Sequence, residues 1–197
     1  FWHFNEKAMG IVDILVVVLA YLLGSLSFAV IVSKAMGMAD PRSYGSGNPG
    51  ATNVLRSGKK KAAILTLLGD ALKGLVAVLL AKYFLDAGSI TEATVAWVAL
   101  AVLIGHMWPV FFGFKGGKGV ATAVGVLFAL SWPVALICTL VWLIMAFGLK
   151  ISSLAALVAT VLSPVLAWVF IDEASWCWAV LFIAILVLYR HKSNIQN

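Results

Sequence analysis

Charged residues are scarce in this chain. Of its 197 residues, only 11% are Asp, Glu, Lys or Arg, whereas 63% are apolar. An ordinary soluble domain carries about 25% charged residues, so the composition excludes a water-soluble enzyme, a nucleic-acid-binding protein and a disordered chain. The net charge of +6 is therefore assigned to the loops of a membrane protein, not to a surface that binds nucleic acid.

Cysteine is also rare. Cys138 and Cys177 lie far apart, in or at the end of apolar runs, and they form no C-x-x-C pair and lie near no histidine cluster. The sequence thus predicts no disulfide framework, no metal site and no cofactor.

A cleavable signal peptide is not evident. The first long apolar run, from Ile11, is longer than the apolar region of such a peptide and has no cleavage pattern. Residues 1–8 precede Met9 and are interpreted as a tag or processed leader. Residues 9–197 are expected to form a single membrane domain.

Apolar runs between breakers predict an all-α integral membrane protein with seven transmembrane helices. A span needs about 20 apolar residues, and the runs cover residues 11–37, 62–86, 93–113, 119–132, 133–149, 151–171 and 174–189. The fourth run is short, so either the bilayer is thinned around it or the span begins below the membrane surface. In the second case the loop before it (residues 113–119) would lie at membrane depth and face a cavity.

Charges are sorted between the two sets of connections. Ten basic residues follow spans one, three, five and seven: Arg42, Arg56, Lys59, Lys60, Lys61, Lys115, Lys118, Lys150, Arg190 and Lys192. The alternate connections carry Asp86, Glu92, Asp172 and Glu173. Since basic loops stay in the cytoplasm, we predict an amino terminus outside, a carboxyl terminus in the cytoplasm and a chain reversal at Ser131-Trp132-Pro133.

The first basic loop contains YGSGNPGATN (residues 44–53). Its glycines permit left-handed backbone conformations and inward-pointing N–H groups, which together form an anion-binding nest. Neutral donors surround the glycines, and Arg56 follows three residues later. The alternative is a flexible, solvated hairpin.

The second basic loop, FGFKGGKGVAT (residues 112–122), is not a P-loop, because its spacing differs. It nevertheless places Lys115 and Lys118 among four glycines where a helix is expected to begin. The amino end of a helix attracts anions, so this loop is a second candidate anion site. The alternative is a basic clamp that only fixes topology.

A few polar residues stand out elsewhere. His191 and Asn194 would share one face if the last helix continues, and His191 is a candidate general base or hydrogen-bond donor to phosphate. The alternative for this pair is a solvated helix end. Asp70 and Lys73, three residues apart within a span, are expected to form a structural ion pair. His106 is expected to be a buried strut or to position the second loop.

Two anion sites on one side of a membrane suit an enzyme that joins two phosphate-bearing molecules, one of which carries an acyl chain. The sequence in fact resembles the bacterial acyl-phosphate-dependent glycerol-3-phosphate acyltransferases of the PlsY type. The resemblance runs from about residue 21 to 195, and it rests on residues 45–56, 105–122 and 190–195, together with Gly69-Asp70 and Lys73-Gly74.

This resemblance implies transfer of a fatty acyl group from acyl phosphate to the 1-hydroxyl of glycerol 3-phosphate, at the cytoplasmic face of the bacterial inner membrane. The implied partners are these two substrates and membrane lipid, without nucleic acid. The acyl phosphate would be bound by Gly45, Ser46, Gly47, Asn48, Gly50, Thr52 and Asn53. Glycerol 3-phosphate would be bound by Arg56, Lys115, Lys118, Ser153, His191 and Asn194. The expected catalytic residues are Lys118, His191, Asn194 and Ser46, with Asp70, Lys73 and His106 as structural support.

Two other classes remain open from the residues alone. A transporter for a phosphate-bearing solute is favoured by the short fourth span that follows a glycine loop. A non-catalytic membrane scaffold would leave both glycine loops unexplained.

Overall fold

The structure, a computed structural model, describes residues 8–195. The interpretation of residues 1–8 as a tag or leader falls on residues 1–7, which lie outside the described part. Within residues 8–195 the ordered elements are helices and no strand occurs. Ten α-helices are α1 (Ile11–Gly24), α2 (Phe28–Ala35), α3 (Ala51–Leu55), α4 (Lys60–Asp86), α5 (Glu92–Met107), α6 (Val120–Leu130), α7 (Trp132–Leu149), α8 (Ser152–Phe170), α9 (Ala174–Arg190) and α10 (Lys192–Ile195). Two 3₁₀ turns are η1 (Pro41–Ser43) and η2 (Val110–Phe112).

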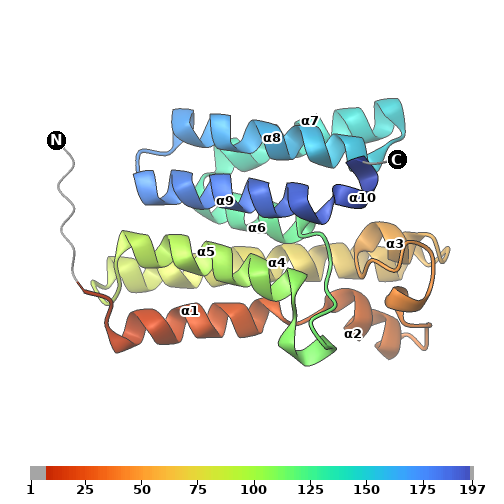
Figure 1. Cartoon of the computed structure of the whole chain (residues 1–197), viewed down its shortest axis with the longest axis horizontal. Helices are drawn as coiled ribbons and strands as arrows, with labels where there is room; N and C mark the ends of the chain where they lie inside the picture. Colours follow the sequence, from red (N-terminus) through yellow and green to blue (C-terminus); the bar gives the residue numbers. More distant parts are fainter. Residues whose placement is uncertain (1–7, 196–197) are drawn as a thin grey trace.

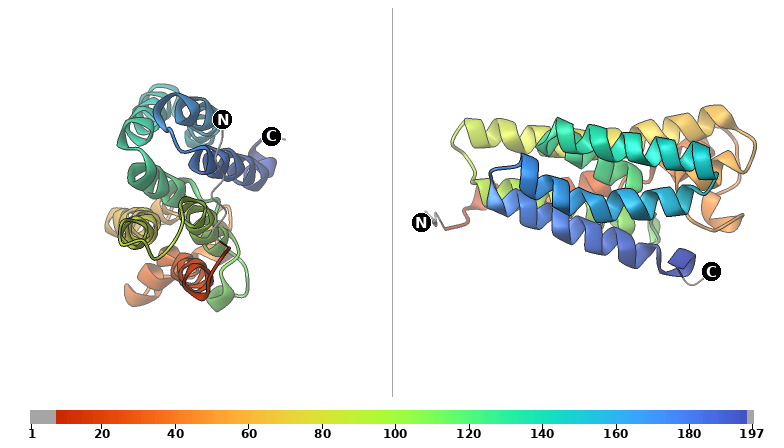
Figure 2. Two further views of the ribbon diagram at one scale, coloured as in Figure 1. Left: turned by 90° about the vertical axis from the view of Figure 1, so that its left-hand side faces the viewer. Right: turned by 90° about the horizontal axis from the view of Figure 1, so that it is seen from above.

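The long helices run along one common direction in stacked layers (Figures 1 and 2). In the described residues, four helices are long and apolar enough to cross a membrane: α4, α5 with its η2 extension, α7 and α8. The bent pair α1–α2 passes the same test as one unit, and α6 and α9 are shorter apolar helices.

The first predicted span is not one continuous helix. α1 and α2 are bent by 45° at a break that comprises Ser25, Leu26 and Ser27. Lys73 Nζ of α4 donates to the Leu26 carbonyl (2.8 Å), so a buried ammonium group satisfies an acceptor that the break releases. The apolar pattern could not predict this break, because its partner comes from another helix.

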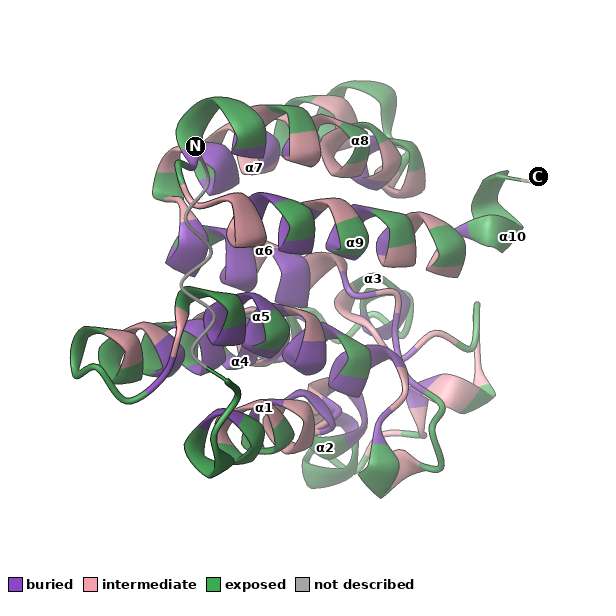
Figure 3. Cartoon of the chain, turned by 60° about the vertical axis from the view of Figure 1, so that its left-hand side comes forward, coloured by how far each residue is buried: buried purple, intermediate pink, exposed green. Residues whose placement is uncertain are grey.

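Close helix packing depends on glycine. A side-chain carbon at Gly24 would lie 2.1 Å from the Val102 carbonyl oxygen of α5, and one at Gly125 would lie 1.9 Å from the Ala71 carbonyl oxygen of α4. Small residues of this kind allow membrane helices to approach to backbone contact. Buried residues accordingly gather where α4, α5 and α6 face one another, while the outer turns of α1, α7 and α8 are exposed (Figure 3).

The predicted reversal at Ser131 is confirmed, because α6 ends at Leu130 and α7 begins at Trp132. α6 has only 11 residues, which is about 16 Å of rise. Lys82 Nζ of α4 donates to the Ala129 carbonyl near the end of α6 (2.9 Å) and lies over the Trp176 ring. A lysine therefore caps the short helix.

The two glycine loops, the α7–α8 turn and the C-terminal helix α10 lie toward one end of the bundle (Figure 1). We call this the basic end, since it carries the ten basic loop residues named above. The connections 87–91, 131 and 171–173 lie at the other end. This arrangement brings segments that are more than one hundred residues apart in the chain to a common site.

Candidate functional site

The first glycine loop is organised by the side chain of Asn53, which is 1% exposed. Its amide nitrogen donates to the carbonyls of Pro41 (2.7 Å) and Tyr44 (3.1 Å), and its oxygen accepts from the Ser46 N–H (3.0 Å). Gly45 has φ +58°, and a side chain there would collide with the Asn53 oxygen at 2.2 Å. Asn53 therefore holds the loop together, a role that the sequence did not reveal.

Three N–H groups of the expected anion-binding nest are bonded within the loop itself. The N–H of Ser46 is bonded to Asn53, that of Gly47 to the Tyr44 carbonyl, and that of Gly50 to the Asn48 carbonyl. Since the loop satisfies these three donors itself, they are not free to bind an anion. The side chains of Ser46 and Thr52 are exposed, and that of Asn48 is half-buried.

Arg42 links this loop to the segment that leads into the second loop. Its guanidinium forms a two-pronged ion pair with Asp40, with a shortest contact of 2.7 Å, and donates to the Phe112 carbonyl (2.9 Å). The hydrogen bonds from Arg42 lower the pKa of Asp40 and outweigh the opposing effect of partial burial. The Asp40–Arg42 pair thus stays charged and fixes the two loops relative to each other.

The second glycine loop folds back along the end of α5. The N–H groups of Gly116 and Gly117 donate to the carbonyls of Met107 (3.1 Å) and His106 (3.2 Å). A side-chain carbon would lie 2.0 Å from the His106 carbonyl oxygen at Gly116 and 2.4 Å from His106 Nε2 at Gly117. These glycines are therefore required for close packing, not as free anion-binding amides.

The two loops also touch each other. A side-chain carbon on Gly117 would lie 3.1 Å from the Pro49 carbonyl oxygen of the first loop. Gly119, with φ +88°, would place one 2.7 Å from Leu103 and Met107 side-chain atoms of α5. The start of α6 consequently packs against the side of α5.

Arg190, at the end of α9, holds the loop from its other side. Its Nη2 donates to the Gly116 carbonyl (2.8 Å) and its Nε to the Gly117 carbonyl (3.2 Å). The guanidinium lies over the Trp108 ring at 5.5 Å. The sequence counted this arginine among the basic loop residues and in the C-terminal block of the resemblance, but it did not predict this contact, because Gly116 and Gly117 are more than 70 residues away in the chain.

Lys118 follows the clamped glycines and meets the C-terminal segment. Its Nζ donates to the side-chain oxygen of Asn194. Partial burial lowers the pKa of Lys118, and the positive charges of Arg190 and Arg56 lower it further. The basic end thus holds a concentrated positive field, which favours an anionic ligand.

His191 lies between α9 and α10 and is 3% exposed. The last helix does not continue unchanged, since α9 ends at Arg190 and α10 begins at Lys192. Nδ1 of His191 is 2.8 Å from the Val187 carbonyl, which can only accept, so Nδ1 carries the proton. Burial lowers the pKa of His191, the bond to Val187 opposes this, and the Lys118 charge lowers the pKa further. The neutral ring therefore offers Nε2 as a proton acceptor.

Two predicted ligands are not joined to this cluster by any contact in the described residues. Lys115 is exposed in the second loop, and Ser153 is half-buried in the first turn of α8. Both lie at the basic end, and their predicted contacts with glycerol 3-phosphate stay predictions.

Asp70, Lys73 and His106 form a buried group below the loops. Asp70 Oδ1 is 3.0 Å from Lys73 Nζ and 3.6 Å from His106 Nδ1. The Thr122 hydroxyl of α6 donates to the Asp70 carbonyl (2.9 Å). This group connects the α1–α2 break, α4, α5 and α6, which supports the expected structural role.

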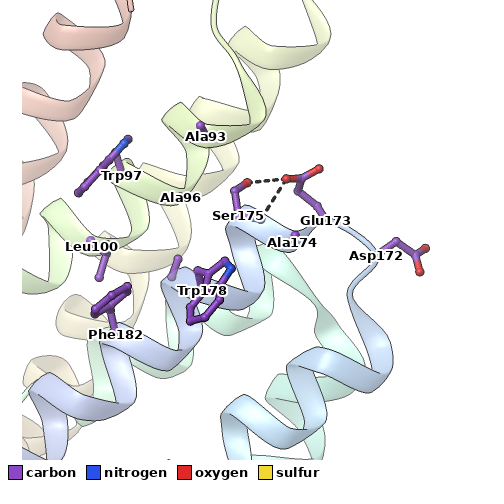
Figure 4. Close-up of a pocket in the computed structure, with 11 residues that line it drawn as sticks. Ala93, Ala96, Trp97, Leu100, Asp172, Glu173, Ala174, Ser175, Trp178 and Phe182 are labelled. Carbon is purple, nitrogen blue, oxygen red and sulfur yellow. Dashed lines mark hydrogen bonds between the residues drawn. The ribbon is translucent and has the colours of Figure 1, made fainter. Parts of the chain in front are cut away.

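A groove of about 360 Å³ lies between α5 and α9, toward the opposite end from the loops (Figure 4). Trp97, Trp178 and Phe182 form its walls, and Asp172 and Glu173 lie at its rim. It contains none of the predicted site residues. Among residues 8–195, no group of three or more His, Cys, Asp or Glu side chains is arranged to hold a metal ion.

Comparison with known proteins identifies the family. The sequence profile described as glycerol-3-phosphate acyltransferase matches residues 14–197. A glycerol-3-phosphate acyltransferase of Neisseria meningitidis (strain FAM18) is 69% identical over 181 residues, which cover 92% of this chain and 90% of the relative. One of Chromobacterium violaceum is 64% identical over 180 residues, which cover 91% and 87% of the two chains.

Solved structures agree with the fold. The glycerol 3-phosphate form of PlsY (YgiH), an integral membrane glycerol 3-phosphate acyltransferase, has a TM-score of 0.85 and 41% identity, covering 94% of this chain and 90% of the other. A lysophosphatidic acid form gives the same TM-score, at 40% identity. The chain is thus an all-helical integral membrane protein and belongs to the glycerol-3-phosphate acyltransferase family.

Proposed function

We propose that this protein transfers a fatty acyl group from acyl phosphate to the 1-hydroxyl of glycerol 3-phosphate, with lysophosphatidic acid and inorganic phosphate as products. The observation that carries the proposal is the meeting of Lys118 with Asn194 beside His191, at the point where the two glycine loops touch. Family membership supports the acceptor, because relatives 69% and 41% identical are described as glycerol-3-phosphate acyltransferases.

Acyl phosphate as donor is supported by the residues that the site contains. Acyl phosphate is an activated anhydride, so its transfer needs no covalent acyl-enzyme. The chain has no G-x-S-x-G nucleophile motif. Cys138 and Cys177 are buried in α7 and α9. The site instead offers what direct transfer requires, namely alignment of two anions and stabilisation of developing negative charge.

The proposed reaction is a single displacement at the acyl carbonyl. The 1-hydroxyl oxygen of glycerol 3-phosphate forms a bond to the carbonyl carbon, and the bond from that carbon to the phosphate oxygen breaks. Ser46 and Asn48 would hold the donor phosphate, together with Thr52. Arg56, Lys118 and Asn194 would hold the acceptor and stabilise the departing phosphate.

The hydroxyl proton needs an acceptor. His191 Nε2 is supported by geometry, since the Nδ1 bond to Val187 leaves Nε2 unprotonated in the neutral ring. A phosphate oxygen of the substrate is the alternative acceptor. The pH profile predicted in the Discussion separates the two.

The proposal includes topology and location. Counting α1–α2 as one bent span, with α4, α5, α6, α7, α8 and α9, gives seven spans. The ten basic loop residues then face the cytoplasm, with the amino terminus outside and the carboxyl terminus inside. The site would lie at the cytoplasmic face of the bacterial inner membrane, where the acyl chain of the donor can remain among the lipid tails.

Phosphate release tests the function directly. Purified protein in lipid nanodiscs is mixed with palmitoyl phosphate, with and without glycerol 3-phosphate, and phosphate and lysophosphatidic acid are both measured. We expect equal amounts of the two products, only when both substrates are present. A parallel reaction with palmitoyl coenzyme A should yield no lysophosphatidic acid, and product from the thioester alone would contradict the proposed donor.

Transport of a phosphate-bearing solute is the second candidate. The broken α1–α2 helix and the folded-back loop before α6 favour it, since transporters use both devices. Uptake of labelled glycerol 3-phosphate into proteoliposomes, without phosphate release in the nanodisc assay, would support transport over acyl transfer.

A further inference from the structure

Arg190 contacts the second glycine loop at two consecutive carbonyls, those of Gly116 and Gly117. The N–H groups of the same two glycines are bonded to α5. All four backbone polar groups of these two residues are therefore hydrogen-bonded: the two N–H groups to the end of α5, and the two carbonyls to a single guanidinium. Lys118 is the next residue in the chain.

The guanidinium is itself held in place. It lies over the Trp108 ring at 5.5 Å, and the Trp108 carbonyl accepts from the Tyr21 hydroxyl (2.8 Å). Arg190 thus rests on an aromatic side chain whose own backbone is tied to α1. A side chain fixed in this way gives the loop little freedom to shift.

We propose that Arg190 is a positioning residue, which fixes Lys118 against the reacting phosphate by clamping the Gly116-Gly117 peptide groups. The inference rests on the proposed function for the role of Lys118. It adds a residue that the predicted site did not include.

A lysine could not replace this arginine. The planar guanidinium presents Nε and Nη2 in a fixed fork, and that fork spans two successive carbonyls. An ammonium group donates all its hydrogen bonds from one atom on a flexible stem, so it cannot hold the two carbonyls at the fixed spacing of the fork. Arg190→Lys therefore keeps the charge but removes the clamp, and Arg190→Gln removes both.

The charge has a separate effect on Lys118. The charged and titratable groups facing Lys118 are Arg190 from α9, Arg56 after α3, and His191 beside Asn194. Arg190 and Arg56 lower the pKa of Lys118, in addition to the larger effect of burial. Arg190→Gln should therefore raise that pKa, while Arg190→Lys should leave it near the wild-type value.

Kinetics in nanodiscs separate clamp and charge. In Arg190→Lys we expect kcat to fall at least about tenfold and KM for glycerol 3-phosphate to rise, with KM for acyl phosphate within about twofold of wild type. The alkaline limb of the pH–rate profile should move to higher pH in Arg190→Gln and stay in place in Arg190→Lys. Lys192→Gln, which removes an exposed cation two residues away, is the matched control and should match wild type.

Hydrogen exchange tests the clamp without turnover. The amides of residues 113–119 should exchange at least about tenfold faster in Arg190→Lys than in wild type or Lys192→Gln, at an unchanged melting temperature. Wild-type exchange and wild-type kcat in Arg190→Lys would overturn the proposal. So would a uniform rise in exchange over the whole chain, which would show a merely structural role. If the wild-type protein released no phosphate, the proposed function would fail, and the exchange experiment would still decide whether Arg190 holds the loop.

Discussion

Lys118, just before α6, donates a hydrogen bond to the side chain of Asn194 in α10. The contact joins the second glycine loop to the C-terminal segment and closes the basic end of the bundle. Because Arg190 precedes the same segment and clamps the same loop, α9 and α10 hold Lys118 from two directions.

Lys118→Ala should lose most turnover while the protein still folds. The lysine is partly exposed and lies outside the packed core, so its removal costs little stability. Loss of one preorganised group that stabilises developing charge typically lowers kcat by about 10²–10³-fold. Phosphate release in nanodiscs and the melting temperature should be measured together, with Lys60→Ala, an exposed lysine at the start of α4, as the control. Wild-type turnover in folded Lys118→Ala would contradict the assignment.

The pH dependence of kcat should show that His191 acts as a base that is neutral at pH 7. Burial lowers its pKa below the usual 6.5, so the ring is neutral at pH 7 and activity should fall only as the pH drops below that value. The folded state binds this proton less tightly than the unfolded chain, so stability should also decrease as the pH falls through the lowered pKa.

The His191→Gln variant separates the ring from the substrates, whose phosphates titrate in a similar range. If His191 is the base, kcat of this variant should be at least about 100-fold lower. Its remaining pH dependence should reflect only the titration of the substrate phosphates. A wild-type acid limb centred above 6.5 would contradict the neutral-base prediction. If kcat of His191→Gln equals that of wild type across the pH range, the proton acceptor is a substrate phosphate.

Gly116→Ala should displace the second loop. Its added methyl group would lie 2.0 Å from a backbone oxygen of His106, which cannot move aside as a flexible side chain can. We expect acyltransferase activity to fall by at least about tenfold, with a higher KM for glycerol 3-phosphate. In Gly148→Ala of α7 the added methyl group meets nothing within 4 Å, so this variant should keep full activity. Alanine also stabilises a helix by roughly 0.5–1 kcal/mol relative to glycine. Equal activity of both variants would refute the close-packing role.

Lys73→Met should destabilise the bundle. It leaves Asp70 as a buried charge without its cation and leaves the Leu26 carbonyl at the α1–α2 break without its donor. Removing one partner of a buried pair costs about 3–5 kcal/mol. Thermal unfolding in detergent should show the loss, with Lys60→Met as the exposed control. The double variant Asp70→Asn/Lys73→Met should recover part of it, and a Lys73→Met protein as stable as wild type would refute the structural role.

The sequence alone predicted the helical membrane fold, because the bilayer imposes a length and an apolar composition on every span. It also predicted the reversal at Ser131, since only that turn keeps the basic loops on one side. The glycine-rich blocks and the C-terminal Arg190-His191 predicted the family. Each of these signals is local or compositional, so it can be read without knowing which helices touch.

Only the tertiary structure decided how the site is held. The break between α1 and α2 depends on Lys73 of α4, and the shape of the first loop depends on the buried amide of Asn53. The glycines of the second loop pack against His106 and Met107, with their carbonyls held by Arg190. These are contacts between residues distant in the chain, and no local pattern encodes them, because a glycine that opens a turn and a glycine that admits a neighbouring backbone look alike in sequence.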